Sequence, residues 1–220
     1  MLTKQIHIFS QGAIMNIFVL STGRCGSTTF IQASRHITNY TSAHESRHGL
    51  VGEERLNFVE NHIEADNRLS WFLGRLDKVY GDNAFYVHLT RDTLGTAKSY
   101  LKRYDTRTVN IYDYSIINPY SRNIIGGNHT QNQPIDICLD YCETVNSNIE
   151  LFLKNKTNKM HFNLENAKED FKIFWDKINA EGDFSAAFAE WDVPHNKAYT
   201  PEMGSRFKRK MKHLMAVLFE

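Results

Sequence analysis

Short apolar runs alternate along the chain with segments in which apolar residues recur at helical spacing. The apolar runs predict strands over 16–20, 84–90 and 159–163. The spaced patterns predict helices over 27–36, 53–62, 67–80, 92–104, 135–149 and 165–178. Strands that alternate with helices favour a mainly parallel sheet with helices on both faces, with ligands at the carboxyl ends of the strands. The pattern therefore predicts a three-layer α/β fold.

The composition limits the classes of protein that fit. With 220 residues and 41% hydrophobic content, the chain can bury one sizeable core, and no Pro/Gly/Ser-rich linker divides it. Lys and Arg number 26 against 25 Asp and Glu, so neither nucleic acid nor a membrane surface is indicated as a partner. Three cysteines and the lack of an apolar stretch of about 20 residues predict a reduced, cytoplasmic protein. We expect a single domain over 15–220, preceded by a leader or a mis-set start over 1–14.

The first candidate site follows the predicted strand over 16–20. Gly23 and Gly26 allow a tight turn and a close approach of the backbone to a ligand. Three hydroxyl residues, 27–29, then open a helix whose unpaired N–H groups and positive dipole end face the same point. A capped turn would explain part of this pattern, but two glycines, Arg24 and three successive hydroxyls favour an anion site. The segment is not a nucleotide triphosphate P-loop, because G-x-x-x-x-G-K-[ST] requires glycine and lysine where this chain has threonines.

A second candidate site follows the predicted strand over 84–90. Arg91 stands at the end of the strand, Ser99 follows eight residues later, and Arg103 lies four residues further on. We expect Arg103 on the same helix face as Ser99, so that all three residues converge on one anion. Two anion sites at the carboxyl ends of two strands predict a ligand with phosphates at both ends.

Both segments resemble those of the sulfotransferases that use 3′-phosphoadenosine-5′-phosphosulfate (PAPS). Thr22-Gly-Arg-Cys-Gly-Ser-Thr-Thr29 resembles their 5′-phosphosulfate loop, and Arg91 with Ser99 resembles their 3′-phosphate motif in residue type and spacing. The resemblance implies a P-loop NTPase-like fold and the following cofactor contacts: Gly23, Arg24, Cys25, Gly26, Ser27, Thr28 and Thr29 in the loop, and Arg91, Ser99 and Arg103 in the second segment. Arg24 is similar to the basic residue that this family places beside the bridging oxygen of the leaving phosphate.

The activity implied by the resemblance is direct in-line transfer of a sulfuryl group from PAPS, which leaves adenosine 3′,5′-bisphosphate (PAP). The acceptor would be a hydroxyl, or an amine, of a small molecule, carbohydrate or peptide. No metal is implied, because a sulfuryl group carries less charge than a phosphoryl group and no clear Walker-B aspartate is present. Two alternatives remain: a P-loop small-molecule kinase using MgATP, which the missing lysine disfavours, and a non-catalytic nucleotide-binding module. A phosphatase mechanism through Cys25 fails on spacing, because a C-x5-R loop requires arginine where Ile31 stands.

The segment His44-Glu-Ser-Arg-His48 supplies the candidate base. It matches the zincin motif H-E-x-x-H, which would make the chain a zinc metalloprotease, but two glycines follow closely where that motif needs a long helix. Glu45-Ser-Arg47 instead resembles the Glu-Thr-Arg of the tyrosylprotein sulfotransferases, whose catalytic glutamate has a similar position after the loop. We therefore expect Glu45 to act as general base and Arg47 to orient it, with His44 or His48 as the alternative base.

Three further features are assigned from the pattern alone. His88 lies inside an apolar strand and is expected to be a hydrogen-bonded core residue. The segment 105–134 is rich in Tyr, Asn and Gly without a clear period, which is typical of a functional or mobile loop. Gly204 and Arg206 are candidates for a C-terminal cofactor loop.

Overall fold

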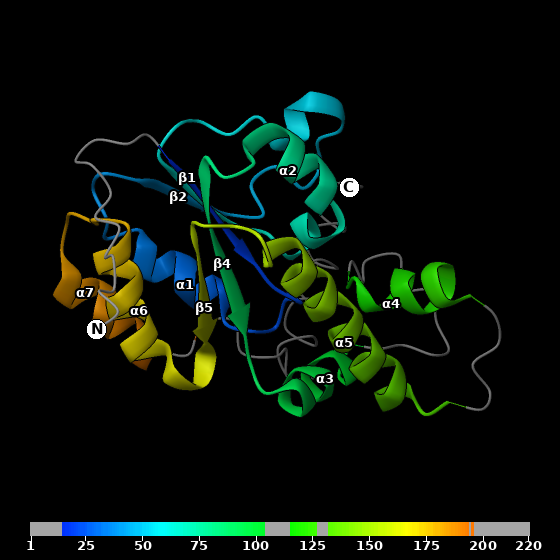
Figure 1. The fold of residues 1–220 in the computed structure, drawn as a ribbon. Coiled ribbons are helices and arrows are strands. Elements are labelled where there is room, and N and C mark those ends of the chain that lie inside the picture. Colours follow the sequence, from blue (N-terminus) through cyan, green and yellow to red (C-terminus); the bar gives the residue numbers. More distant parts are fainter. Residues whose placement is uncertain (1–14, 104–114, 127–131, 194, 196–220) are drawn as a thin grey trace, which may run out of the picture.

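The fold is built on a five-stranded parallel sheet. A computed structural model describes residues 15–103, 115–126, 132–193 and 195. The strands are β1 (Asn16–Leu20), β2 (Thr41–His44), β3 (His62–Ala65), β4 (Ala84–Thr90) and β5 (Lys159–Asn163). Their order in the sheet is β2-β3-β1-β4-β5, and every neighbouring pair is parallel (Figure 1).

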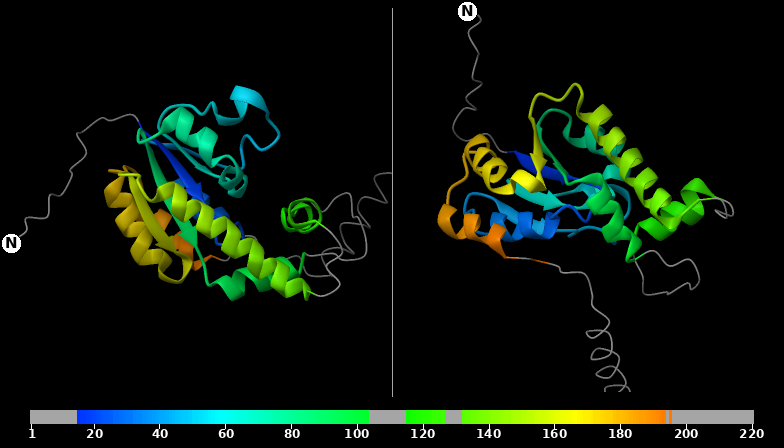
Figure 2. Two further views of the ribbon diagram at one scale, coloured as in Figure 1. Left: turned by 45° about the vertical axis from the view of Figure 1, so that its right-hand side comes forward. Right: turned by 90° about the horizontal axis from the view of Figure 1, so that it is seen from below.

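Helices cover both faces of the sheet (Figures 1 and 2). One face carries α1 (Ser27–Ser34), α6 (Ala167–Lys177) and α7 (Phe184–Ala189), and the other carries α2 (Leu73–Tyr80), α3 (Thr93–Leu101) and α5 (Pro134–Leu153). Short 3-10 turns lie at Gly52–Leu56, Asn67–Trp71, Leu164–Asn166 and Glu190–Asp192, and α4 (Ile117–Pro119) continues into a π-helical turn over Tyr120–Ile125. The three layers confirm the predicted α/β fold.

The central strands are buried on both sides. Alternate residues of β1 face the two helix layers, with Phe18 toward α2 and α5 and Val19 toward α1 and α6. Full burial of such a side chain contributes about 1.5–3 kcal/mol. A strand covered on both faces needs apolar residues at consecutive positions, which is why 16–20 and 84–90 are continuous apolar runs. His88 of β4 is also buried and hydrogen-bonded to an asparagine of α5, as predicted for a core histidine.

The strand order reverses between β1 and β4, and this reversal positions the site. The chain leaves β1 through α1 toward β2 at one edge of the sheet, and it leaves β4 through α3 and α5 toward β5 at the other edge. In doubly wound sheets, ligands bind in the crevice that opens at such a reversal, outside the carboxyl ends of the strands. Arg24 of the loop after β1 and Arg91, which follows β4, both line a cavity there.

The sequence pattern misses two strands, β2 and β3. The helix predicted over 53–62 is wrong, because this segment holds only a 3-10 turn, a loop and the first residue of β3. The helix predicted over 67–80 begins with a 3-10 turn before α2. β3 carries His62 and Glu64 at buried positions, where Nε2 of the histidine lies 3.0 Å from Oε2 of the glutamate. Polar residues become compatible with a buried strand only through such tertiary partners, which a local pattern does not show.

Several predicted features lie outside the described residues. They are the leader over 1–14, the parts of the long loop over 104–114 and 127–131, and the candidates Gly204 and Arg206. Within the described ranges, no helix is long and apolar enough to cross a membrane.

Candidate active site

The loop between β1 and α1 adopts the left-handed conformation at three residues. The φ angle is 82° at Gly23, 61° at Arg24 and 91° at Gly26. A Cβ atom on Gly23 would lie 2.6 Å from Oη of Tyr100, and one on Gly26 would lie 2.6 Å from Cδ1 of Leu164. Both contacts are shorter than real Cβ atoms allow, so the tight turn requires glycine at both positions.

The backbone of Thr22 anchors the start of this loop. Its carbonyl oxygen accepts hydrogen bonds from Oη of Tyr100 at 2.5 Å, Oη of Tyr141 at 2.8 Å and Nδ2 of Asn67 at 3.4 Å. Burial raises the pKa of both tyrosines, so their hydroxyls keep their protons and donate them. Residues of α3, α5 and the turn before α2 therefore hold the loop in place.

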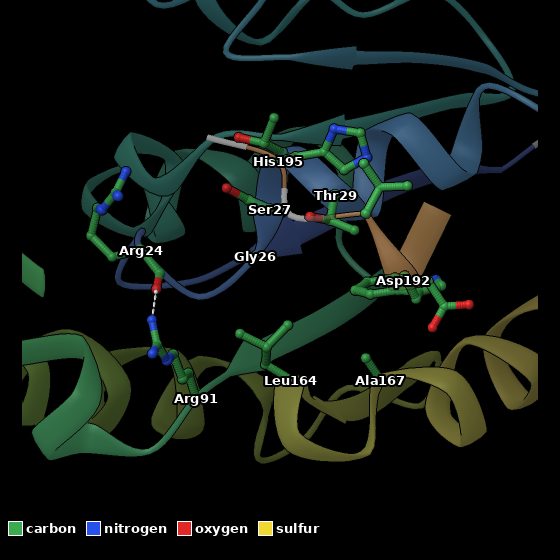
Figure 3. Close-up of a pocket in the computed structure, with 12 residues that line it drawn as sticks. Arg24, Gly26, Ser27, Thr29, Arg91, Leu164, Ala167, Asp192 and His195 are labelled. Carbon is green, nitrogen blue, oxygen red and sulfur yellow. Dashed lines mark hydrogen bonds between the residues drawn. The ribbon is translucent and has the colours of Figure 1, made fainter. Parts of the chain in front are cut away.

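The N-terminus of α1 faces a cavity of about 440 Å³ (Figure 3). Gly26 is the N-cap and offers no side-chain cap, and the first turn contains no acidic residue. The N–H groups of 27–29 thus have no intrahelical acceptor, and the positive end of the helix dipole lies with them. The hydroxyl residues Ser27, Thr28 and Thr29 line the same cavity, as the sequence predicts for an anion site.

Three arginines gather beside the loop. Nε of Arg24 donates to Oγ of Ser99 at 3.1 Å, and Nη1 of Arg91 lies 3.4 Å from the carbonyl oxygen of Arg24. Burial lowers the pKa of Arg24, and the charges of Arg103 and Arg91 lower it further. Among the described residues, no carboxylate forms an ion pair with any of the three arginines. A cluster of positive charges without a counter-ion is suited to bind an anion.

Of the residues predicted for the second anion site, Arg91 lines the cavity, Ser99 contacts the side chain of Arg24, and the charge of Arg103 acts on Arg24. One prediction needs correction. Arg103 is not on the helix face of Ser99, because α3 ends at Leu101 and Arg103 follows in a turn. The side chain of Arg24 lies on Ser99 and away from Thr29 (Figure 3). Its place beside the bridging oxygen of a leaving phosphate therefore stays a prediction.

Another wall of the cavity comes from residues that the sequence reasoning missed: Leu164 and Ala167 near the start of α6, and Trp191, Asp192, Val193 and His195 after α7 (Figure 3). Glu190 fixes this wall to the end of α1, because its two carboxylate oxygens lie 3.2 Å from Nε2 of His36 and 2.7 Å from Nε2 of His195. Neither a motif nor a period marks 190–195 in the sequence. A tryptophan among polar residues is the only signal there, and it is not specific.

Glu45 follows β2 directly and is held in an unusual backbone conformation. Its φ angle is 52°, its N–H donates to the carbonyl of Ala65 at 3.0 Å, and its Oε2 accepts from Nη1 of Arg68 at 2.7 Å. The next residue, Ser46, donates through N and Oγ to the buried carboxylate of Glu64 at 2.7 and 2.6 Å. The left-handed conformation costs a non-glycine residue roughly 1–2 kcal/mol. It persists where the surroundings fix it, and such positions cluster at functional sites.

Arg47 does not orient Glu45, contrary to the prediction. Its Nη1 donates to the carbonyl of Glu54 at 2.7 Å and lies 3.5 Å from Oε2 of the same residue. Arg68 occupies the place beside Glu45 instead. Arg68 is 23 residues further along the chain, so no short motif could have indicated it.

The two histidines of the H-E-x-x-H match have separate partners. His44 ends β2, and its Nε2 lies 3.0 Å from Oγ of Ser27, whereas Nδ1 of His48 lies 2.7 Å from the carbonyl oxygen of Glu45. The zincin motif requires both rings on one helix, but this segment is a strand end and a turn. In the described part of the chain, no three His, Cys, Asp or Glu residues are grouped to hold a metal ion. The segment therefore does not form a zincin site, and the structure gives the zinc metalloprotease alternative no support.

Cys25 is a buried residue of the loop. Its Sγ lies 2.9 Å from Oγ1 of Thr22 and 3.1 Å from the carbonyl oxygen of Gly23. Burial raises the pKa of the thiol, which keeps it protonated and unreactive. This environment agrees with the exclusion of a phosphatase mechanism.

Two solved structures with a similar arrangement of strands and helices are sulfotransferases. The chain matches a sulfotransferase from Alicyclobacillus acidocaldarius with a TM-score of 0.51 and 13% identity, over 94% of this chain and 97% of that chain. It matches mouse sulfotransferase SULT7A1, crystallised in complex with PAP, with a TM-score of 0.50 and 14% identity over 80% of this chain. That match spans 64% of the mouse enzyme's length. No family model and no curated protein matches the sequence. The chain therefore has the α/β fold of sulfotransferases, which confirms the fold that the resemblance implied.

Proposed function

We propose that the protein is a sulfotransferase that moves a sulfuryl group from PAPS to a hydroxyl or amine acceptor. The observation that carries this proposal is the pair of anion sites across the β1–β4 crevice. One site is the α1 N-terminus, with uncapped N–H groups and three hydroxyls. The other is the arginine cluster around Ser99, in which no described carboxylate neutralises Arg24, Arg91 or Arg103.

The residues of the cavity, together with Ser99 and Arg103, which interact with its Arg24, fit a nucleotide with anionic groups at both ends. The N–H groups and hydroxyls of 27–29 would hold the 5′-phosphosulfate, and Arg91, Ser99 and Arg103 would hold the 3′-phosphate. Trp191 lines the same cavity and offers a flat apolar surface for the adenine ring. The volume of about 440 Å³ lies within the roughly 300–1,000 Å³ that is usual for small-molecule sites. The PAP complex of the mouse sulfotransferase supports this choice of ligand.

Bound PAPS would supply the sulfuryl group: a bond would form between sulfur and the acceptor oxygen or nitrogen, the bond from sulfur to the 5′-phosphate oxygen would break with its electron pair on that oxygen, and PAP would leave. Glu45 takes the acceptor proton as general base and releases it to water. Arg24 and the N–H groups of α1 stabilise the negative charge that grows on the leaving oxygen. His44, hydrogen-bonded to Ser27, is the alternative base.

Ligand-induced thermal stabilisation tests this proposal. PAP should raise the melting temperature more than adenosine 5′-monophosphate or MgATP does, because only PAP has a 3′-phosphate for the arginine cluster. Arg91→Ala should weaken PAP binding by roughly ten- to a hundredfold, the usual value of a charge-assisted hydrogen bond, and should leave binding of the monophosphate unchanged. Arg75→Ala is the matched control, because this arginine donates to the carbonyl of Gly52 away from the cavity. Equal stabilisation by all three nucleotides, or a preference for MgATP, contradicts the proposal.

A further inference from the structure

Arg68 connects the Glu45 turn to the protein interior. Its Nη1 lies 2.7 Å from Oε2 of Glu45, and the two side chains are 27% and 31% exposed. Its backbone N–H donates to Oδ1 of Asp66 at 2.8 Å, in the turn that follows β3. The same guanidinium nitrogen lies 3.8 Å from Oδ1 of Asp66. Arg68 is thus fixed at its backbone and lies between two carboxylates.

The side chains that hold Arg68 in place are buried. The Asp66 side chain is fully buried and accepts from Nη2 of Arg55 at 2.5 Å, and the Arg55 side chain is 2% exposed. Burial alone would lower the pKa of Arg68, but the hydrogen bond and charge of Glu45, together with Asp66, raise it above its ordinary value. Arg55, Asp66, Arg68 and Glu45 therefore form a chain of alternating charges that runs from the core to the turn after β2.

We infer that Arg68 is a positioning residue that acts through Glu45 and holds its carboxylate in one orientation. This inference rests on the proposed function, in which Glu45 is the base. A guanidinium that is itself anchored and donates a hydrogen bond to a carboxylate restricts the rotation of that carboxylate. When Glu45 takes up a proton and loses its charge, Asp66 remains as a second carboxylate for Arg68.

Among the residues that the structure describes, the other charged groups around this turn form no hydrogen bond or ion pair with the carboxylate of Glu45. Arg47 pairs with Glu54, Nδ1 of His48 meets the backbone oxygen of Glu45, and His44 meets Ser27. Asp66 lies behind Arg68. Arg68 is thus the cation whose removal changes the environment of this carboxylate.

The first test compares Arg68→Gln with Arg68→Lys, using Arg75→Gln as the matched control. Arg68→Gln should lower kcat by about 10- to 100-fold, the usual effect of losing a charge-assisted hydrogen bond, with KM for PAPS changed less than about twofold. Arg68→Lys keeps the positive charge and a hydrogen-bond donor, and should lower kcat less than Arg68→Gln does. An unchanged kcat in Arg68→Gln, or a rise in KM alone, overturns the inference.

The second test uses the double variant Glu45→Gln/Arg68→Gln. If Arg68 acts through Glu45, the double variant is no slower than Glu45→Gln alone. A further loss of about tenfold or more would show that Arg68 acts on the donor directly, and would overturn the inference.

The third test does not depend on activity. The carbon-13 NMR signal of the Glu45 carboxyl group, assigned by its loss in Glu45→Gln, should have a different chemical shift in Arg68→Gln than in the wild type, because the hydrogen bond from Nη1 of Arg68 is lost. Melting temperatures check that both proteins are folded. An identical chemical shift overturns the inference even if the enzyme transfers sulfate. If the two signals differ but the wild type neither binds PAP nor transfers sulfate, the proposed function is refuted and the pairing of Arg68 with Glu45 stands.

Discussion

Replacing Gly26 by alanine is expected to damage both the stability of the protein and its phosphosulfate site. The φ angle of 91° costs an alanine about 1–2 kcal/mol, because its Cβ crowds the backbone in the left-handed region. The added Cβ also lies 2.6 Å from Cδ1 of Leu164, and moving this flexible side chain adds about 1 kcal/mol. The two terms sum to about 2–3 kcal/mol, which corresponds to a fall of about 5–10 °C in melting temperature for a chain of this length.

Calorimetry and PAP titration measure the two effects of Gly26→Ala. Gly49→Ala is the matched control, because no atom lies within 4 Å of an added Cβ there and φ is not in the left-handed region. In the double variant Gly26→Ala/Leu164→Ala, only the part of the stability loss that comes from the contact with Leu164 should be restored. The backbone strain at position 26 remains. PAP affinity should fall by about tenfold or more, because the N–H groups after Gly26 are displaced. A Gly26→Ala protein with the stability and PAP affinity of the control would refute this reasoning.

Three further predictions concern single side chains. Glu45→Gln should cut sulfate transfer by roughly 10²–10⁴-fold and leave PAP binding unchanged, and full activity would move the base to His44. Cys25 should resist alkylation at pH 8 in the native protein and react after unfolding, because burial raises the pKa of its thiol; rapid labelling of native protein, read by peptide mass mapping, would contradict this. The pKa of Glu190 is lowered by its hydrogen bond from His36 and by His195, so its contribution to stability is present above the ordinary value of 4.5 and lost as pH falls through the lowered pKa. Below pH 4.5, the urea concentration at the midpoint of unfolding should therefore fall less steeply with pH in Glu190→Gln than in the wild type. The same pH dependence in both proteins would show that Glu190 does not contribute.

The parts of the fold that a short stretch of sequence predicts are those that the residues of that stretch determine by themselves. β1 and β4 are apolar at consecutive positions because helices cover both of their faces, and the turn at Gly23 and Gly26 requires glycine in any setting. These features sufficed to predict the layers and the loop, whereas the convergence of Arg91 and Ser99 on one anion stays a prediction. The strand β5 followed from the same kind of apolar run.

The features that the sequence did not predict depend on partners far away in the chain. Glu64 is compatible with a buried strand only because Ser46 and His62 satisfy its carboxylate. Arg68 becomes relevant to the site through one contact with Glu45, whereas Arg47, the nearer arginine, turns to Glu54. Spacing along the chain identifies residues that share an element, but it does not determine which of two nearby arginines contacts a given carboxylate.

Ser99 and Tyr100 are consecutive residues of α3, and they contact different parts of the same loop. Ser99 meets the side chain of Arg24, while Tyr100 donates to the carbonyl of Thr22. A single helical turn therefore fixes α3 against both the side chain and the backbone of the loop. If the protein binds PAPS as proposed, we expect this fixed placement to select nucleotides by the distance between their two anionic groups.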